Sequence, residues 1–377
     1  MRSGIVCSGV SCLDLFLFGT APLLTRESLS MVEQTQYRPG GATSNTGHAL
    51  AKLGMPVEFM TVIGADANGD ILLDLWKRDG IGTGHVVRST AAGTALSTIP
   101  VYQDGKRGVY FCPGTNELMS IDNLFGPNCE YLEVLRGRLS FHIGYPPLMA
   151  RLQGKDLAEV LSVVRETGVL TSLDTTPVAD DTTLREMLAP ALAVAHMFTP
   201  NVEEASQVAG QFTRLAGQAK EESARRGEPV EIENIVTPDD LNGIGEALLA
   251  LGVPIAVITL GPQGAFLCTG SAAALRDVPL ADAAWANQRL YVPAFQVDGP
   301  INSTGAGDTF TAGVLTGLCH GFTSLVEIAR LAHATGALHV DLSRGACACA
   351  EVQAALPAMR VRPPQNPHLA AEVMSFA

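Results

Sequence analysis

Short apolar runs alternate along the chain with segments in which apolar residues recur at helical spacing. The apolar runs predict buried strands at 4–10, 57–63, 139–144, 169–174, 193–198 and 255–260. The amphipathic segments predict helices at 46–53, 69–79, 155–167, 182–192, 201–210 and 238–251. This alternation predicts an α/β fold, in which helices cover both faces of a doubly wound, mostly parallel sheet.

Two segments, 13–39 and 85–116, break this order because they hold strand-like runs with no helix between them. In the second segment, the turn Gln103-Asp104-Gly105-Lys106 predicts a hairpin between runs at 94–102 and 108–112. We expect 13–39 and 85–116 to form a small, discontinuous β lid, and 1–12, 40–84 and 117–377 to form the α/β domain. The charged segment 211–235 predicts a surface excursion without a catalytic role.

Composition argues against several classes of protein. The 25 Lys and Arg residues against 38 Asp and Glu residues give a net charge of −13, which argues against nucleic acid and anionic membranes as partners. Apolar runs such as 253–260 are too short to span a bilayer, and the N-terminal run, interrupted at Asp14, predicts a core strand rather than a signal peptide. The eight scattered cysteines predict reduced core thiols in a cytoplasmic protein.

A glycine-rich segment, NSTGAGD at 302–308, immediately precedes an apolar helix predicted at 309–318. The glycines expose the free N–H groups at the start of the helix, and these donors and the helix dipole stabilise an anion. Asp308 lies in the first turn, where a carboxylate stays ionised and can accept a proton from a substrate hydroxyl. The alternative is that Asp308 only caps the helix and the glycines only form a turn.

Residues 302–315, NSTGAGDTFTAGVL, resemble the second signature of the PfkB family of carbohydrate kinases. Residues 40–45, GGATSN, followed by Gly54 and Gly64, resemble the first signature. That signature departs from the usual pattern at Thr43, where Pro, Gly or Ala is usual, and at Gly47, where Ser, Thr or Ala is common. The similarity extends over about residues 4–346, without 211–235.

The resemblance implies a ribokinase-like fold and ATP-dependent phosphorylation of a hydroxyl of a small sugar or sugar-like substrate. It makes Asp308 the general base and places the anion hole at Gly305, Ala306 and Gly307. The α/β domain then binds the nucleotide, and Mg²⁺ accompanies ATP. The lid covers the substrate, and its open face offers a surface for a homodimer.

On the substrate side, the resemblance implies that Asp14 binds substrate hydroxyls, because it directly follows the first strand; a plain turn aspartate is the alternative. Gly40 and Gly41 are expected to let the substrate lie close to the backbone. Asn45 donates to a hydroxyl, caps the helix that it opens, or does both.

On the nucleotide side, Asn201 and Glu204 resemble the N-x-x-E element of the family, and their spacing places both on one face of a helix start. Glu204 is expected to support Mg²⁺, directly or through water, and Asn201 to reach phosphate. The alternative is a solvated acidic first turn.

Residues 259–264, TLGPQG, resemble the nucleotide loop of the family, which implies ATP contacts for Thr259, Gly261 and Gly264. A simple hairpin is the alternative reading of the segment. His333 falls where similar kinases approach the adenine, and a core or surface histidine is its alternative.

Asn302 occupies a position where many relatives carry an aspartate that helps bind a monovalent cation. Asn keeps an oxygen ligand and loses the charge, so we expect weak activation by K⁺. Three functions stay open: a sugar kinase, a nucleoside kinase whose base stacks on lid aromatics, and a non-catalytic relative that binds ligand. A phosphosugar acceptor, within the first of these, requires a basic contact, for which Lys106 and Arg107 are the candidates.

Overall fold

The computed structural model describes residues 3–20, 29, 31–103, 106–127, 129–178, 181–299, 301–341 and 349–376. In this part of the chain nine strands form the main sheet, in the spatial order β15-β14-β13-β12-β11-β10-β9-β1-β4. Six strands run parallel: β1 (Ile5–Gly9), β4 (Val57–Met60), β9 (Ser140–Gly144), β10 (Leu170–Leu173), β11 (Met197–Phe198) and β12 (Ile255–Thr259). Three antiparallel strands extend one edge: β13 (Gly264–Thr269), β14 (Arg289–Pro293) and β15 (Met374–Ser375). The predicted mostly parallel sheet is confirmed.

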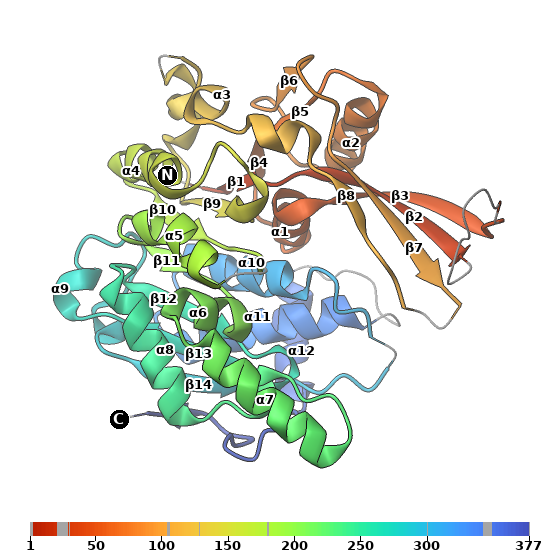
Figure 1. The fold of residues 1–377 in the computed structure, drawn as a ribbon. Helices are drawn as coiled ribbons and strands as arrows, with labels where there is room; N and C mark the ends of the chain where they lie inside the picture. Colours follow the sequence, from red (N-terminus) through yellow and green to blue (C-terminus); the bar gives the residue numbers. More distant parts are fainter. Residues whose placement is uncertain are drawn as a thin grey trace.

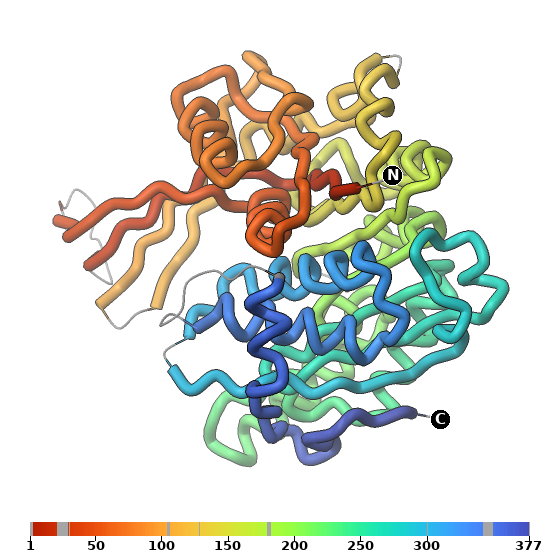
Figure 2. The backbone as a smooth tube through the Cα atoms, turned by 180° about the vertical axis from the view of Figure 1, so that it is seen from behind, coloured from red at the N-terminus to blue at the C-terminus, as the bar shows by residue number. Residues whose placement is uncertain are grey.

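Helices cover both faces of this sheet, and each face has its own apolar core (Figures 1 and 2). One core is contributed by α4 (Gly154–Glu166), α5 (Asp181–Leu192), α6 (Val202–Ala209), α7 (Phe212–Arg226) and α8 (Pro238–Ala250). The other is contributed by α1 (Gly41–Lys52), α2 (Ala67–Arg78), α10 (Ala306–Cys319), α11 (Leu325–Val340) and α12 (Cys349–Ala355). Because neither face meets water, central strands such as β1 and β9 are buried at every residue.

Shorter elements complete the described chain. They are α3 (Ile121–Phe125) and α9 (Ala272–Leu275), the 3₁₀ helices η1 (Gly114–Leu118), η2 (Glu130–Leu135), η3 (Pro146–Leu148), η4 (Ile232–Asn234), η5 (Gly261–Gln263), η6 (Ala283–Trp285) and η7 (Leu356–Ala358), and the paired strands β5 (Val62–Gly64) and β6 (Val87–Ser89). Within the described ranges no helix combines the length and the apolar character that crossing a bilayer requires.

A second sheet of four described strands projects from the α/β body as the predicted lid (Figure 1). Its order is β3-β2-β7-β8, formed by β2 (Cys12–Thr20), β3 (Gln34–Gly40), β7 (Leu96–Tyr102) and β8 (Tyr110–Cys112). Strands β2 and β7 run parallel and the other pairs antiparallel, so the lid is a mixed sheet. Residues 21–28 and 30 of the predicted lid, and residues 104 and 105 of the predicted turn, lie outside the described residues. The exact domain boundaries and the homodimer stay predictions.

Two local predictions differ from the structure. The segment 211–235 is not an irregular excursion, because most of it forms α7, which buries Leu215 and Ala219 against the core. Its polar residues dominate the composition, so the two buried positions are a weak signal in the sequence. Helix α1 begins at Gly41 rather than at residue 46, with Gly40 as its N-cap residue. Asn45 therefore lies inside the helix and does not cap it.

Candidate active site

Asp308 is the third residue of α10, and its side chain is 1% exposed. The residue before the helix, Gly305, adopts a φ of 72°, the left-handed conformation that favours glycine. Ala306 donates its N–H to the Ser303 carbonyl at 3.1 Å, whereas helix geometry provides no intrahelical acceptor for the N–H groups of Gly307 and Asp308. A Cβ placed on Gly307 would meet no atom within 4 Å, so this end of the helix is open to a ligand.

The Asp308 carboxylate accepts hydrogen bonds from two distant parts of the chain. Asn45 Nδ2 and the Tyr145 hydroxyl each donate to Oδ2 at 2.9 Å, and the Thr46 hydroxyl lies 3.5 Å from Oδ1. All three donors belong to other elements, and this set of contacts does not favour the capping alternative. Burial raises the pKa of Asp308 to about 6, against the lowering effect of these three donors. A carboxylate with a pKa near neutrality suits a general base.

Two residues of this site were missed by the sequence analysis. Tyr145 directly follows β9, has a φ of 61°, and donates to Asp308. Asp174 directly follows β10 and is 5% exposed, with one oxygen accepting from the N–H of Thr175 at 2.7 Å. Burial, followed by the negative charges of Asp308 and Glu204, raises the pKa of Asp174 well above its usual range. The signal in the sequence that could have identified both residues is their position directly after a buried strand. Polar residues at the carboxyl ends of buried parallel strands line the binding edge of such sheets.

Asn201 and Glu204 form a capping box at the start of α6. The Asn201 side chain accepts from the Glu204 N–H at 2.8 Å, and Glu204 Oε2 accepts from the Asn201 N–H at 2.8 Å. Glu204 is 5% exposed, so the turn is not a solvated one, and burial raises the pKa of Glu204 to about 8. A buried carboxylate is stabilised by a cation, so Glu204 with its neighbour Asp174 fits a site beside Mg²⁺.

This acidic group does not make a complete metal site by itself. Among the described residues, no three His, Cys, Asp or Glu side chains come together as a metal-binding cluster. That arrangement suits Mg²⁺, which keeps several waters and takes other oxygens from substrate phosphates. The residues present therefore fit an ion held partly by the nucleotide.

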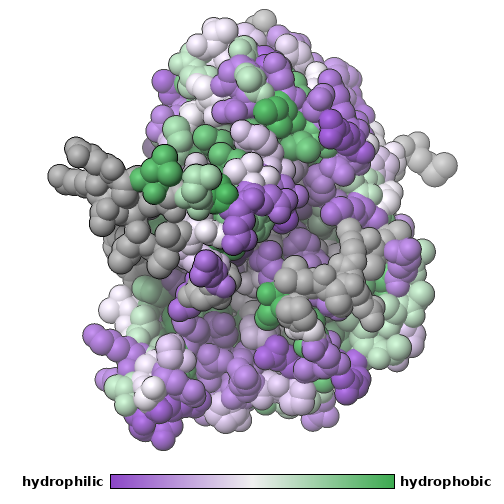
Figure 3. Space-filling model, turned by 90° about the vertical axis from the view of Figure 1, so that its right-hand side faces the viewer, coloured by the Kyte–Doolittle hydropathy of each residue, from purple (hydrophilic) through white to green (hydrophobic). Residues whose placement is uncertain are grey.

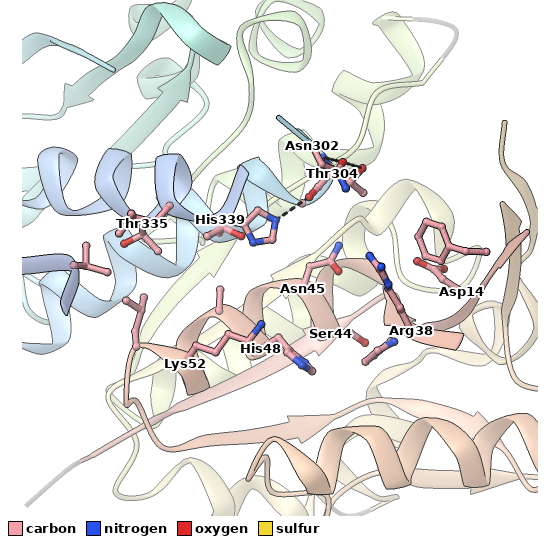
Figure 4. Close-up of a pocket in the computed structure, with 18 residues that line it drawn as sticks. Asp14, Arg38, Ser44, Asn45, His48, Lys52, Asn302, Thr304, Thr335 and His339 are labelled. Atoms are coloured by element: carbon pink, nitrogen blue, oxygen red, sulfur yellow. Dashed lines mark hydrogen bonds between the residues drawn. The ribbon is translucent and has the colours of Figure 1, made fainter. Parts of the chain in front are cut away.

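A cavity of about 430 Å³ opens between α1, the lid and the N-terminal end of α10 (Figure 4). Among the predicted residues, Asp14, Asn45, Asn302 and Gly305 line it. Figure 3 looks onto the lid end of the molecule and shows hydrophilic side chains gathered near its middle. Four predicted site residues, which the sequence separates by almost 300 positions, thus border one space.

Gly40 and Gly41 are required by contacts within the folded chain, because a side chain at either position would clash with a neighbouring residue. A Cβ on Gly40 would lie 2.3 Å from Asp14 Oδ2, and a Cβ on Gly41, at a φ of 81°, would lie 2.4 Å from the Val10 carbonyl oxygen. Burial raises the pKa of Asp14, whereas hydrogen bonds from Ser97 and Cys12 and the charges of Arg107 and Arg38 lower it. The two glycines thus allow the Asp14 carboxylate to sit against the start of α1, at the edge of the cavity.

The predicted nucleotide residues lie at the carboxyl edge of the main sheet. Asn201 and Thr259 form a parallel bridge there. Gly261 begins η5 with a φ of 52°, and Gly264 follows η5 with a φ of 142°. Strands β12 and β13 are antiparallel on either side of this loop, so it is also a hairpin. A Cβ on Gly261 would lie 3.2 Å from Glu233 Oε1. The segment 211–235 therefore reaches the predicted nucleotide loop, and its predicted lack of a catalytic role stays a prediction.

His333 is 7% exposed and lies in the core between α10, α11 and β14. Its Nε2 meets the Val292 carbonyl at 3.1 Å, and its ring centroid lies 4.9 Å from that of Phe310. Burial lowers the pKa of His333 to about 4, so the ring is neutral. This geometry fits the core alternative, and the adenine contact stays a prediction.

Asn302 is held by its own loop and by the lid. Its Oδ1 accepts from the N–H and the hydroxyl of Thr304, at 3.1 and 2.9 Å, and from Arg107 Nη1 at 3.3 Å. The guanidinium of Arg107 thus contacts the position where relatives with aspartate are expected to hold a monovalent cation. Asn302 makes the contact as a neutral acceptor.

Known proteins resemble this chain over most of its length. The model of the pfkB family carbohydrate kinases matches residues 3–353. The ribokinase of Staphylococcus aureus (strain COL) is 21% identical over 310 residues, 82% of this chain and 84% of the relative. Probable fructokinase-4 of Arabidopsis thaliana is 26% identical over 343 residues, 89% of this chain and 90% of the relative.

Solved structures share the fold. The structure of Arabidopsis thaliana ribokinase complexed with ribose and ATP has a TM-score of 0.69 at 22% identity, covering 94% of this chain and 99% of that one. The ribokinase-like architecture expected from the sequence is therefore confirmed. Because the family model spans nearly the whole chain, the protein belongs to the pfkB family and is a carbohydrate kinase.

Proposed function

We propose that the protein transfers the γ-phosphoryl group of ATP to a hydroxyl of a small sugar or sugar-like acceptor. The observation that carries this proposal is the position of Asp308, at an open helix N-terminus and bonded to Asn45, which lines the cavity. A nearly neutral pKa, two fixed donors and an adjacent anion hole are the features that phosphoryl transfer requires.

In this mechanism Asp308 accepts the proton of the acceptor hydroxyl, and the hydroxyl oxygen attacks the γ-phosphorus. The bond from that phosphorus to the β,γ-bridging oxygen breaks, and ADP leaves. The N–H groups of Gly307 and Asp308, with the dipole of α10, stabilise the charge on the phosphoryl in flight. Glu204 and Asp174 are the residues that would stand beside Mg²⁺, which neutralises triphosphate charge when bound.

Two remaining alternatives are less well supported by the site. A nucleoside acceptor requires an aromatic face for its base, and Phe16 of the cavity wall is covered by the Arg38 guanidinium, 4.9 Å from the ring centroid. A non-catalytic relative would have no need of a buried base with a pKa near 6. A screen for ADP release with Mg-ATP over neutral sugars, acidic sugars, phosphosugars and nucleosides tests the proposal, and turnover of nucleosides alone would contradict it.

Tyr145→Phe tests whether the phenol positions and tunes the base. The hydroxyl donates to the ionised carboxylate and lowers its pKa, so its loss raises the pKa of Asp308. We expect the acidic limb of the kcat–pH profile to move up by about one pH unit, since a hydrogen bond to a charged group contributes about 1.5 kcal/mol or more. Tyr131→Phe, an exposed tyrosine on η2, is the matched control. An unmoved profile in Tyr145→Phe would leave the hydroxyl a purely structural role.

Potassium is expected to activate the enzyme weakly. Asn302 supplies no negative charge, and Arg107 already contacts its oxygen, so a cation gains little there. We expect the rate to change by less than about twofold when K⁺ replaces tetramethylammonium at constant ionic strength, because uncharged oxygens bind hard cations weakly. Asn302→Asp is expected to increase the response to K⁺. Strong activation of the unaltered enzyme by millimolar K⁺ would contradict this account.

A further inference from the structure

We propose that the natural acceptor carries an anionic group, a carboxylate or a phosphate ester, and that Arg38 and Arg107 bind this group beside Asp14. The inference rests on the proposed function and deepens it by naming the chemical class of the acceptor. It depends on the orientation of Arg38, the contacts of Arg107 and the balance of charge around the cavity.

Within the described part of the chain Arg38 forms no salt bridge, and its charge acts on the carboxylate of Asp14. It lies opposite Asp14 in the register of β2 and β3, and its Nε and Nη2 donate to Gln36 Oε1 at 3.1 and 2.8 Å. The guanidinium also stacks on Phe16, with Cζ 4.9 Å from the ring centroid. Figure 4 shows it between Asn45 and Asp14, at the wall of the cavity. An arginine held this way by a neutral amide and a ring keeps its positive charge for a ligand.

Arg107 brings a second guanidinium from the lid to Asn302, which lines the cavity, although Arg107 is not itself one of the described lining residues. It bridges to Val101 beside β7, and its Nη1 donates to the neutral Asn302. Both guanidinium charges reach Asp14, since both lower its pKa. An aspartate at 302 would pair directly with Arg107, whereas asparagine leaves Arg107 without a charged partner at this contact. The asparagine at position 302 and its contact with Arg107 therefore both favour an anionic ligand beside Arg107.

The charge of the cavity wall is opposite to that of the whole protein. Among its described lining residues Asp14 is the sole acidic side chain, whereas Arg38 and Lys52 are basic. The chain as a whole carries a net charge of −13. A neutral sugar requires acceptors and donors such as Asp14 and Asn45, and gains nothing from two further guanidinium groups. A carboxylate or phosphate matches their planar, two-donor geometry.

The cavity extends from the neighbours of Asp308 to the lid, so one acceptor can contact both. Gly305 and Asn45, which adjoin Asp308, line the same space as Asp14 and Arg38. An acceptor with its reacting hydroxyl at Asp308 would therefore place a distal anionic group at the lid. The volume of about 430 Å³ lies within the range of small-ligand sites. Arg38, missed as a basic contact by the sequence analysis, joins Arg107 in this role.

The test compares acceptors that differ in one anionic group and are otherwise closely matched. The open-chain compounds glucitol and gluconate form the carboxylate pair. Fructose and fructose 6-phosphate, in which the 6-hydroxyl is esterified, form the phosphate pair. We expect kcat/KM to favour the charged member of one pair by at least about tenfold, the effect of one charge-assisted contact. Arg38→Gln and Arg107→Gln are expected to remove that preference through KM, and to leave the pH profile of kcat unchanged. The pair that responds identifies the anionic group.

Arg78→Gln is the matched control, because Arg78 is 74% exposed on α2 and pairs with Asp74 away from the cavity. Calorimetric binding of the four acceptors to the unaltered and Arg38→Gln proteins, without ATP, provides a readout independent of turnover. Turnover without any charge preference would overturn this inference and leave the proposed function intact. Binding of an anionic acceptor through Arg38, with no ATP-dependent turnover, would overturn the proposed function alone. Failure of both charged acceptors to bind and to react would overturn the inference.

Discussion

Asp308→Asn is expected to reduce kcat by about 10² to 10⁴, the usual effect of removing a general base, while both substrates still bind. The amide keeps nearly the shape of the carboxylate and can still accept from Asn45 and Tyr145, which donate to Oδ2. It cannot accept the proton of the hydroxyl. Its loss of negative charge also removes repulsion of the γ-phosphate, so ATP is expected to bind slightly more tightly. The measurements are kcat and calorimetric affinities for ATP and the acceptor.

The same variant is expected to be more stable than the unaltered protein at high pH. Burial raises the pKa of Asp308 from 3.8 to about 6, so the folded state binds this proton more tightly than the unfolded state. The stabilisation from protonated Asp308 is complete below about pH 4 and is lost as the pH rises through about 6. The uncharged amide of Asp308→Asn does not deprotonate, so the variant does not lose this stabilisation as the pH rises. We therefore expect the Tm of the variant to exceed that of the unaltered protein at about pH 8 and to approach it near pH 4.

Asp156→Asn is the matched control for both measurements. Asp156 is also the third residue of a helix, α4, but it is exposed and far from the cavity lining. We expect it to change neither kcat nor the pH dependence of Tm. If Asp308→Asn reduces kcat by less than about tenfold, Asp308 is not the base. A parallel collapse of affinity and Tm would assign it a structural role instead.

Glu204→Gln is expected to raise the Mg²⁺ concentration for half-maximal activity by at least about tenfold, with little change in the affinity for the acceptor. Glutamine can complete the same capping box, because its amide oxygen can accept from the Asn201 N–H as Glu204 Oε2 does. The substitution therefore removes the negative charge and keeps the start of α6. In the proposed arrangement the acceptor lies on the lid side of Asp308, away from this charge.

Glu203→Gln removes an equal charge from the neighbouring, exposed position of α6. We expect it to leave the dependence on Mg²⁺ within about twofold of the unaltered enzyme, since exposed charges act weakly on a buried site. Titration of ADP release with Mg²⁺ at fixed ATP measures both variants. If Glu204→Gln keeps the dependence of the unaltered enzyme, Glu204 serves only as part of the capping box.

Local signals in the sequence were sufficient for the alternating strands and helices of the parallel part of the sheet and for the helix that carries Asp308. Apolar runs and glycine positions are short-range features, because burial on both faces and a left-handed turn each leave a mark within a few residues. The NSTGAGD segment thus predicted both the start of α10 and the exposed donors there. The helix α7 was missed because only Leu215 and Ala219 mark its buried face.

Partnerships between distant residues were decided by the tertiary structure alone. Asn45 and Tyr145 reach Asp308 across 263 and 163 residues, and no local pattern encodes which strand ends meet α10. The sequence offered capping as an alternative for Asn45 and Asp308. The start of α1 at Gly41 places Asn45 inside its helix, and the packing of α1 against α10 brings its amide to Asp308.

The positive charge at the proposed acceptor site also depends on contacts that only the tertiary structure shows. The sequence by itself determined that the chain is acidic and that position 302 lacks a carboxylate. It could not determine that Arg38 lies opposite Asp14, because that pairing depends on the register of β2 against β3. Nor could it place Arg107 on Asn302, a contact between the lid and the loop that precedes α10. Strand register and lid packing are set by many long-range contacts at once, which is why tertiary structure alone brought these charges together.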